Sequence, residues 1–355
     1  MMKRLYCAIL LISFCTVGVY AQNNGLSCTQ VLRTARQVYE AGRLHELPAL
    51  LDGCLKDGFT QTEKVEAYKI LVYTYIYLEE PQKADEAMIK LLETDHFFEL
   101  NKAVDPIEFQ NLYTKFRTTP IFSYGLKAGL NATQLNVMKN YYIWGEGMGK
   151  GTYKQSLGYQ VGVVFEKNLN KQFILNPEIV YNSSAFVYAN DKISALDDAV
   201  NNQPADKSEF TIKQNRILLN VLAQYKLGNS KFNPYIAVGP SIGYLINSSF
   251  GGSVIVGSQN TISSIDATKN YKTITLGVTG SIGAKYKVGS IYITGDIRYQ
   301  YGISNVVNSS NRYQPTKENV QLWNYGYIDN DFSMRQAMFN IGLIVPYFKP
   351  KKLIK

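Results

Sequence analysis

Histidine is almost absent from this sequence of 355 residues, which contains only His45 and His96. A Ser–His–Asp set and most zinc sites need histidine. Glu93 and Glu99 flank His96, but no second histidine or cysteine lies beside them, so a solvated helix end is a better interpretation than a zinc site. We therefore expect no catalytic residue, no metal and no cofactor. A rim site of Asp, Glu and Ser stays open as an alternative, because such sites are recognised by geometry.

Long apolar runs are also missing, except near the start of the chain. Residues 5–19 form one such run, which follows Lys3 and Arg4 and precedes a short stretch ending in Ala21. The run is too short to cross a bilayer comfortably. A basic start, a short apolar run and a small residue before the cleavage point are typical of an export signal. We expect residues 1–21 to be this signal.

Cysteine is scarce as well. Two of the four cysteines, Cys7 and Cys15, fall within the predicted signal, which leaves Cys28 and Cys54. In an oxidising compartment these two can form a disulfide. Two inert buried thiols are the alternative, because spacing alone does not establish connectivity.

Dense runs of basic residues are absent, although the formal net charge is +9. The only basic segment of note is the tail at residues 349–355, KPKKLIK. No aromatic–basic motif accompanies it. We therefore expect no nucleic acid among the partners.

Residues 22–118 have the periodicity of helices. Apolar residues recur at three-to-four spacing on both sides of Gly42, and again on both sides of Pro81. A fifth helix is expected to begin with Asp105 as its cap. The two helix pairs align at an offset close to the roughly 34 residues of a tetratricopeptide unit, so the region resembles a degenerate tetratricopeptide repeat. A bond from Cys28 to Cys54, worth about 3 kcal/mol, would offset the shortness of the array.

After Pro120 the helical period gives way to strict alternation. In IYITGDIRYQYGI, residues 291–303, Ile293 and Ile297 point one way while Asp296 and Arg298 point the other. The candidate strands lie near residues 121–133, 156–167, 172–183, 211–227, 232–247, 271–287, 290–303 and 333–348.

The connections between these candidate strands alternate between short and long. Short turns are expected at 168–171, 228–231 and 288–289, and long polar connections at 134–155, 184–210, 248–270 and 304–332. This asymmetry, with an even number of strands, is typical of a transmembrane barrel with short periplasmic turns. The sequence thus predicts an all-β barrel of eight antiparallel up-and-down strands over residues 119–348, preceded by a periplasmic all-α helical-repeat domain.

An eight-stranded barrel has an interior that side chains fill. We expect the polar faces of the strands to line it, with Lys127, Gln160, Glu166, Glu178, Arg216, Asn220, Gln224, Lys285, Asp296, Arg298, Gln336 and Asn340 inside. Buried ions persist when they are paired and hydrogen-bonded. We interpret Glu178, Arg216, Lys285, Asp296 and Arg298 as a lumenal polar network that plugs the barrel. A path for protons or ions is the alternative.

The segment WGEGMGKGTYK, residues 144–154, invites comparison with a phosphate-binding loop. Its lysine is followed by Gly151 instead of Ser or Thr, and the segment joins two strands instead of a strand and a helix. We interpret it as a glycine-rich loop.

Several strand segments resemble those of one family of barrels. The segments are GLKAGLNAT (125–133), FILNPEIVYNSS (173–184), RILLNVLAQYKLG (216–228), NPYIAVGPSIGYLI (233–246) and DIRYQYGISNV (296–306). In this order they are similar to the PorT-like outer-membrane barrels of Bacteroidetes. The resemblance implies an eight-stranded barrel in the outer membrane, and its named member belongs to a protein-secretion apparatus. The helical domain in front departs from that member.

These features favour a binding or assembly protein over an enzyme. Helical repeats commonly present a concave surface to peptides or partner domains. We expect the barrel to contact outer-membrane lipid and the helical domain to dock an unidentified periplasmic or outer-membrane protein of an envelope or secretion assembly. A surface receptor or adhesin that acts through the four long loops is the main alternative, and a narrow transporter is the third.

Overall fold

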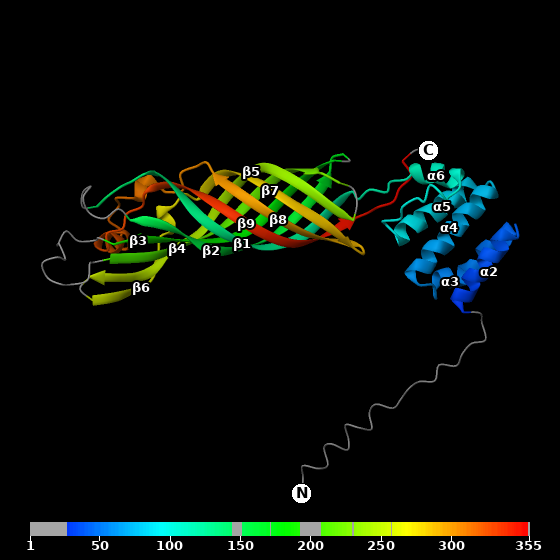
Figure 1. Cartoon of the computed structure of the whole chain (residues 1–355), viewed down its shortest axis with the longest axis horizontal. Coiled ribbons are helices and arrows are strands. Elements are labelled where there is room, and N and C mark those ends of the chain that lie inside the picture. Colours follow the sequence, from blue (N-terminus) through cyan, green and yellow to red (C-terminus); the bar gives the residue numbers. More distant parts are fainter. Residues whose placement is uncertain are drawn as a thin grey trace, which may run out of the picture. The chain divides into compact units, whose positions relative to one another are not determined.

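The computed structural model describes residues 27–143, 151–170, 172–191, 207–228, 231–256 and 258–353. The predicted export signal, and residues 144–150 of the glycine-rich loop, lie outside this part of the chain. The chain divides into two compact units (Figure 1). A helical unit extends to Arg117 and also includes the residues from Pro350 onward, and a barrel unit comprises Thr118–Lys349.

The helical unit contains two antiparallel helix pairs and a short fifth α-helix. Its elements are α2 (Cys28–Glu40), η1 (Leu44–Glu46), α3 (Leu47–Lys56), α4 (Gln61–Tyr77), α5 (Pro81–Thr94) and α6 (Ile107–Thr114). Capping boxes at Ser27 and Thr60 start α2 and α4, and Pro81 opens α5. None of the helices in the described part of the chain is long and apolar enough to cross a membrane.

The core of the helical unit lies between these helices and is apolar. Leu47, Leu51 and Met88 are fully buried in it. Cys28, at the start of α2, and Cys54, near the end of α3, form a disulfide with their Cα atoms 5.6 Å apart. The predicted pairing is therefore confirmed. A bond that closes a loop of this length stabilises the unit by about 3 kcal/mol in the loop-entropy description.

Asp105 does not cap the fifth helix as predicted. That helix, α6, begins at Ile107 with Pro106 as its N-cap residue. The Asp105 carboxylate instead accepts a hydrogen bond from the Tyr73 hydroxyl at 2.9 Å and pairs with Lys69 at 2.5 Å. These contacts tie the segment before α6 to α4, and they hold the pKa of Asp105 below its ordinary value although burial opposes this shift.

The predicted basic tail belongs to the helical unit from Pro350 onward. Residues 350–353 run antiparallel to residues 115–117, where Arg117 donates its backbone N–H to the Lys351 carbonyl at 2.9 Å and Leu353 donates to Lys115 at 2.7 Å. The Lys352 ammonium also forms an ion pair with Asp85 of α5. Segments from both sides of the barrel sequence therefore build the helical unit.

The barrel unit is a closed ring of eight antiparallel strands, as predicted. The ring order is β1 (Phe122–Lys139), β2 (Thr152–Asn168), β3 (Phe173–Asn190), β4 (Lys207–Lys226), β5 (Phe232–Val256), β7 (Ile274–Val288), β8 (Ile291–Gly302) and β9 (Asp331–Tyr347). Pairing of β1 with β9, from Phe122 opposite Tyr347 to Lys139 opposite Asp331, closes the ring. Tight turns connect the strands at one end, the short-turn end, and long segments connect them at the other, the long-loop end (Figure 1).

Much of what the sequence predicted as long loops is regular structure. Strand β3 continues to Asn190 and β4 begins at Lys207, and these two strands pair along this whole length. A ninth strand, β6 (Ser258–Asp266), pairs with the end of β5. The long-loop end also contains η2 (Thr268–Asn270), η3 (Ser309–Asn311) and α7 (Lys317–Asn324). The expectation of long polar loops was therefore wrong for these segments.

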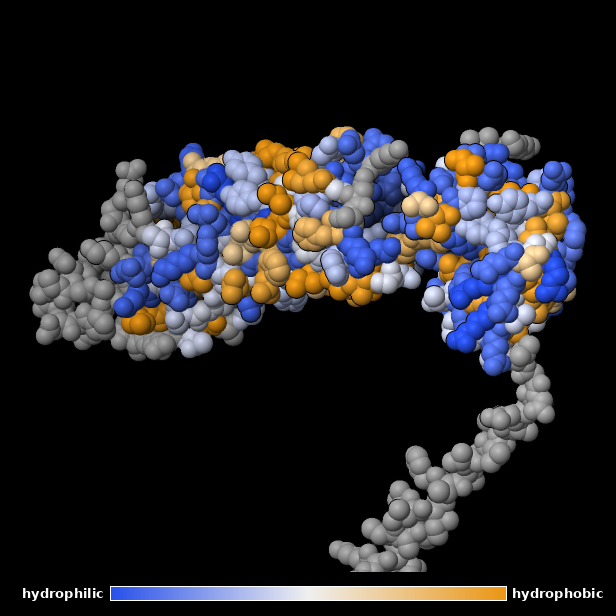
Figure 2. Space-filling view, turned by 45° about the vertical axis from the view of Figure 1, so that its right-hand side comes forward, coloured by the Kyte–Doolittle hydropathy of each residue, from blue (hydrophilic) through white to orange (hydrophobic). Residues whose placement is uncertain are grey.

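The middle of the barrel wall is apolar on its outer face. Ile297 is 68% exposed and Ile282, opposite it on β7, is 70% exposed. Exposed aromatic side chains such as Tyr124, Phe232 and Tyr286 lie near the short-turn end. Figure 2 shows hydrophobic side chains gathered along the barrel wall. An apolar band with aromatic residues beside it is the surface that a transmembrane barrel presents to lipid.

Candidate functional site

The barrel interior is polar at the level of the apolar wall. Every side chain that the alternation assigned to the lumen is buried, including Glu178 at 1% and Asp296 at 2% exposure. They alternate along each strand with the exposed residues, because successive side chains of a strand point to opposite faces. The candidate site is therefore the interior of the barrel.

Four charged side chains from three strands form a central ion-pair network. Arg298 donates from Nε to Asp296 Oδ1 at 2.6 Å and from Nη2 to Glu178 Oε1 at 2.8 Å. Lys127 Nζ lies 3.1 Å from Glu178 Oε1 and 3.0 Å from Asp296 Oδ2. Each carboxylate thus contacts both cations. Such charge-assisted bonds compensate for the removal of the ions from water.

A second ion pair lies beside this network. Lys285 Nζ contacts Glu166 at 2.6 Å, and both side chains are buried. Tyr235 links the two groups: its ring lies 5.5 Å from Lys285 Nζ, and its hydroxyl donates to Asp296 Oδ2 at 3.1 Å. The charged interior is therefore one connected arrangement.

Two glycines leave the space that this arrangement needs. A Cβ atom on Gly342 would lie 2.6 Å from Cγ of Lys127, and one on Gly283 would lie 2.7 Å from Cζ of Tyr235. Each distance is shorter than a carbon–carbon contact allows. Gly342 and Gly283 therefore let Lys127 and Tyr235 extend across the interior.

Arg216 was predicted to join the network, but the structure gives it other partners. Its Nε and Nη2 donate to Gln214 Oε1 at 3.2 Å and 3.0 Å, and its Nη1 donates to Thr275 Oγ1 at 3.3 Å. Lys285 was also expected beside Asp296 and Arg298, and it pairs with Glu166 instead. Sequence alternation places these residues inside but does not give their height along the barrel.

A layer of amide side chains lies next to the ion pairs. Gln160 donates to Asn340, Asn182 donates to Gln160 at 3.1 Å, and Gln336 exchanges hydrogen bonds with Asn182. Asn340 in turn donates to Asp296 at 2.8 Å. Hydrogen bonds therefore continue from the ion pairs into the amides, as buried polar groups require.

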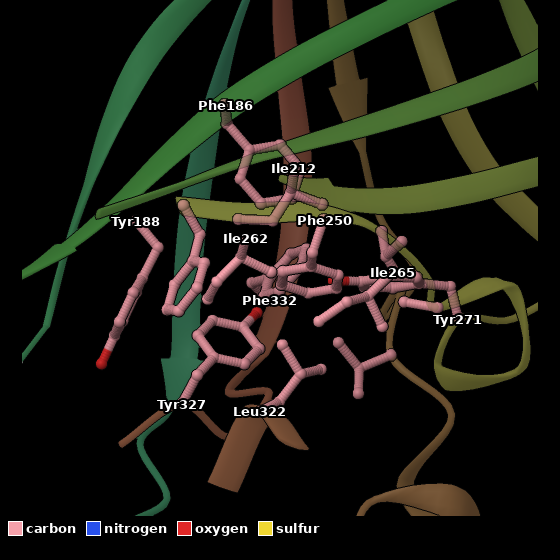
Figure 3. Close-up of a cluster of buried hydrophobic side chains, with 14 of the residues drawn as sticks. Phe186, Tyr188, Ile212, Phe250, Ile262, Ile265, Tyr271, Leu322, Tyr327 and Phe332 are labelled. Carbon is pink, nitrogen blue, oxygen red and sulfur yellow. The ribbon is translucent and has the colours of Figure 1, made fainter. Parts of the chain in front are cut away.

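Toward the long-loop end the interior becomes an aromatic cluster (Figure 3). The cluster comprises Phe186, Tyr188, Phe210, Ile212, Leu245, Phe250, Val254, Ile262, Ile265, Ala267, Tyr271, Val306, Val307, Leu322, Tyr327, Phe332 and Met334. Tyr327 packs edge-on against Phe250 and Tyr188 with ring centroids 4.8 Å apart in both pairs. Strands and loop segments thus contribute to one hydrophobic core inside the barrel.

One carboxyl group is buried in the aromatic cluster. Asp329 accepts hydrogen bonds from the hydroxyls of Tyr327 at 2.8 Å and Tyr271 at 2.9 Å, and from Asn270 at 3.3 Å. Burial raises the pKa of Asp329 to about 6, although these hydrogen bonds oppose the shift. Arg312 contacts the Asp329 backbone carbonyl at 2.8 Å and forms an ion pair with Asp331.

Sequence reasoning missed the aromatic cluster and the role of Lys127. Lys127 was assigned to the lumen but not to the network. A signal for the cluster was present in the spacing of Phe186 and Tyr188, just beyond one predicted strand end, and of Phe210 and Ile212, at the start of the next predicted strand. That pattern is typical of a strand whose apolar face points inward.

His96, the candidate considered for a zinc site, has a backbone carbonyl as its neighbour. Nδ1 of His96 lies 2.8 Å from the Leu92 carbonyl, at the end of α5. Within the described ranges, no group of three or more His, Cys, Asp or Glu side chains could hold a metal ion.

Known structures similar to this chain are outer-membrane barrels. Neisserial surface protein A is 14% identical with a TM-score of 0.30, over 66% of this chain and 97% of that one. OprG from Pseudomonas aeruginosa is 13% identical with a TM-score of 0.33, over 65% and 98%. The outer membrane protease OmpT from Escherichia coli is 9% identical with a TM-score of 0.35, over 64% and 96%. No curated protein matches the sequence.

The family assignment rests on the sequence of the barrel itself. The profile of the outer membrane protein beta-barrel domain matches residues 118–308. This segment covers more than half of the chain and runs from β1 through β8. The chain therefore belongs to the family of outer membrane proteins with this beta-barrel domain.

Proposed function

We propose that the protein is a non-enzymatic outer-membrane anchor whose helical unit is a periplasmic docking platform for an envelope or secretion assembly. The observation that carries this proposal is the place where the chain enters and leaves the barrel. Phe122 begins β1, Tyr347 ends β9, and the two are paired at the short-turn end. Short turns of such barrels face the periplasm. The segments that lead to the helical unit start from this end.

The filled interior supports an anchor over a transporter. Lys127, Glu178, Asp296 and Arg298 bridge the lumen, and the aromatic cluster fills it toward the long-loop end. A solute that crosses the barrel would have to displace both. The apolar outer wall supports outer-membrane lipid as the surroundings of the barrel.

Features of the helical unit support its role in docking. Tyr77, Val104 and Ile107 are 52%, 71% and 59% exposed, although each is a large apolar side chain. The unit has its own core and its own disulfide. The resemblance of its helix pairs to tetratricopeptide repeats, and of the barrel to PorT-like proteins of Bacteroidetes, supports a protein partner in a secretion or envelope assembly.

A surface receptor or adhesin is the second candidate. It is favoured by the regular structure at the long-loop end, where Tyr313, between η3 and α7, is 60% exposed and Val320 of α7 is 39% exposed. A binding surface held by a rigid core suits recognition. This function would use the long-loop end of the barrel.

Photo-crosslinking in intact cells distinguishes the two candidates. A photoreactive amino acid replaces Tyr77 or Ile107 in the helical unit, and Tyr313 at the long-loop end serves as the matched exposed position. We expect a defined protein adduct from Tyr77 or Ile107 and none from Tyr313. Adducts formed only from Tyr313, or only after external ligand is added, would replace the docking platform by the receptor.

Cysteine labelling tests the orientation separately. Tyr313→Cys at the long-loop end should react with a membrane-impermeant maleimide added to intact cells, whereas Ser290→Cys, in the turn between β7 and β8, should react only after the outer membrane is opened. The reverse result would place the helical unit outside the cell and exclude a periplasmic platform.

A further inference from the structure

Among the described residues, Arg216 is a buried cation of the barrel interior with no carboxylate paired to it. Lys127 and Arg298 share Glu178 and Asp296, and Lys285 pairs with Glu166. Arg216 is 3% exposed, and no ion pair to a carboxylate is formed by it within the described residues. An uncompensated ion in an interior of low dielectric constant is strongly unfavourable.

Neutral groups satisfy only part of the Arg216 guanidinium. Three of its nitrogens donate to Gln214 and Thr275, whereas a guanidinium carries five N–H groups. The amide nitrogen of Gln214 is buried and has no hydrogen-bond partner. Arg216 thus keeps N–H donors without an acceptor at this place, and such donors favour an anion.

A cavity of about 30 Å³ lies at this place. Its lining includes Arg216, Thr275, Asn182, Gln300 and Gln336, together with apolar groups from the aromatic cluster such as Met334. A site of roughly 10–15 Å³ already holds one water molecule. The cavity thus has room for a single small ion but not for a carboxylate that belongs to a larger ligand.

Asp329 does not supply the missing negative charge. Its side chain is engaged by Tyr271, Tyr327 and Asn270, and Arg312 is the cation that faces it. Burial also favours its neutral form, as the pKa of about 6 indicates. No carboxylate of the described residues therefore supplies the counter-charge of Arg216.

We propose that the cavity beside Arg216 is a binding site for a small inorganic anion of the size of chloride. The ion lies where the amide layer meets the aromatic cluster, and it completes the charge balance of the interior. Arg216, which lines the cavity, donates to it. This site is independent of the proposed docking function, because it concerns only the stability and filling of the barrel.

Bromide gives a direct test, because it replaces chloride and has an anomalous X-ray signal. Crystals of the full chain, purified and grown in sodium bromide, should show one anomalous peak beside the Arg216 guanidinium. The urea midpoint of unfolding should also be higher in chloride than in gluconate at equal ionic strength, because gluconate is too large for the cavity and only a bound ligand stabilises by mass action. A peak without this difference in midpoint would mean an adventitious ion only and would overturn the proposal.

Gln214→Glu tests the site in a variant that we expect to fold. Its carboxylate would take the position of the Gln214 oxygen, which already lies 3.0 Å from Nη2 of Arg216, and would supply the charge internally. We expect this variant to lose the chloride dependence and the bromide peak. Lys213→Gln, which removes a charge from an exposed position of the same strand, should keep both. Retention of the full chloride dependence in Gln214→Glu would overturn the proposal.

Discussion

The two halves of the barrel interior are built from the same strands but filled in opposite ways. Along β4, the inward residues Phe210 and Ile212 belong to the aromatic cluster, whereas Arg216, Asn220 and Gln224, further toward the short-turn end, are buried polar side chains. All of them lie on one face of β4, because the register shift between Asn215 and Arg216 in the pairing with β5 places its extra residue, Ile246, on β5. The identity of each inward side chain, and not the geometry of the strand, therefore determines whether the interior is apolar or polar.

The outer face of β4 changes at the same place. Glu209 and Lys213 are exposed beside the apolar half, and Leu219 and Val221 are exposed beside the polar half. The change falls near Asn215. In water, folding removes apolar side chains from the solvent, whereas in lipid the apolar face already has a favourable surrounding. The comparison shows that the hydrophobic effect builds the long-loop half and that hydrogen bonds and ion pairs fill the half inside the membrane.

The largest expected effect comes from breaking the polar half. Arg298→Leu leaves Glu178 and Asp296 with Lys127 as the only cation, and removal of one partner from a buried pair costs about 3–5 kcal/mol. Adding Glu178→Gln leaves one cation, Lys127, beside one carboxylate, Asp296. The double variant should therefore recover part of the lost stability. Urea unfolding, monitored by heat-modifiable migration, measures the stability of the single and the double variant. A double variant that is less stable than Arg298→Leu would contradict the network.

A charge on the outer face should have an effect only in the membrane half. Ile297→Arg places a cation in lipid and should cost about 2–4 kcal/mol near the midplane of the bilayer. Thr211→Arg, on the outer face of β4 between Glu209 and Lys213, should change stability by less than about 0.5 kcal/mol. Neutralising Glu178 should not rescue Ile297→Arg. Equal costs at both positions, measured by unfolding in lipid bilayers, would show that the boundary near Asn215 is misplaced.

The apolar half should respond to pH through Asp329. Its folded pKa of about 6 lies above the ordinary value near 4. The folded state therefore binds the proton more tightly, and its stabilising contribution is complete below about pH 4 and is lost as the pH rises through 6. The wild type should lose about 2–3 kcal/mol relative to Asp329→Asn between pH 4 and pH 7. A constant difference between the two proteins over this range would show that Asp329 does not titrate there.

The membrane half was the more predictable half. Alternation such as that of Ile297 and Arg298 is enforced by lipid on one side and a narrow interior on the other, so the eight ring strands and the lumenal side chains could be assigned from sequence. The partners could not be assigned, because a contact across the lumen depends on strand register. Arg216 and Lys285 face inward as expected, yet only Glu178, Asp296 and Arg298 of the predicted network are in direct contact.

The long-loop half was less predictable because its strands lose the pattern that marks a membrane strand. Ser183 and Ser184 interrupt the apolar pattern of β3, and the outer face of β4 before Thr211 carries Lys207 and Glu209, so strand ends were predicted there. The ninth strand, β6, forms a hairpin with the end of β5, and its Ser, Gln, Asn and Thr residues led to its prediction as part of a polar loop. The helix α7 covers only Lys317–Asn324, a length at which isolated helices are unstable and depend on packing, here through Leu322.

The smallest expected effect is on ion conductance. Its measurement tests whether each half of the interior closes the barrel without the other. Full-length wild type in a planar bilayer should give no steady single-channel steps, because the ion pairs and the aromatic cluster lie in series. Arg298→Leu with Glu178→Gln loosens only the polar half, and Phe250→Ala with Phe332→Ala thins only the apolar half, so neither pair should conduct. A variant with all four substitutions lacks both the ion pairs and part of the aromatic cluster. Single-channel steps are expected in this variant. Steps in either double variant would mean that the unchanged half does not seal the lumen. Steps in the wild type would favour the transporter over the anchor.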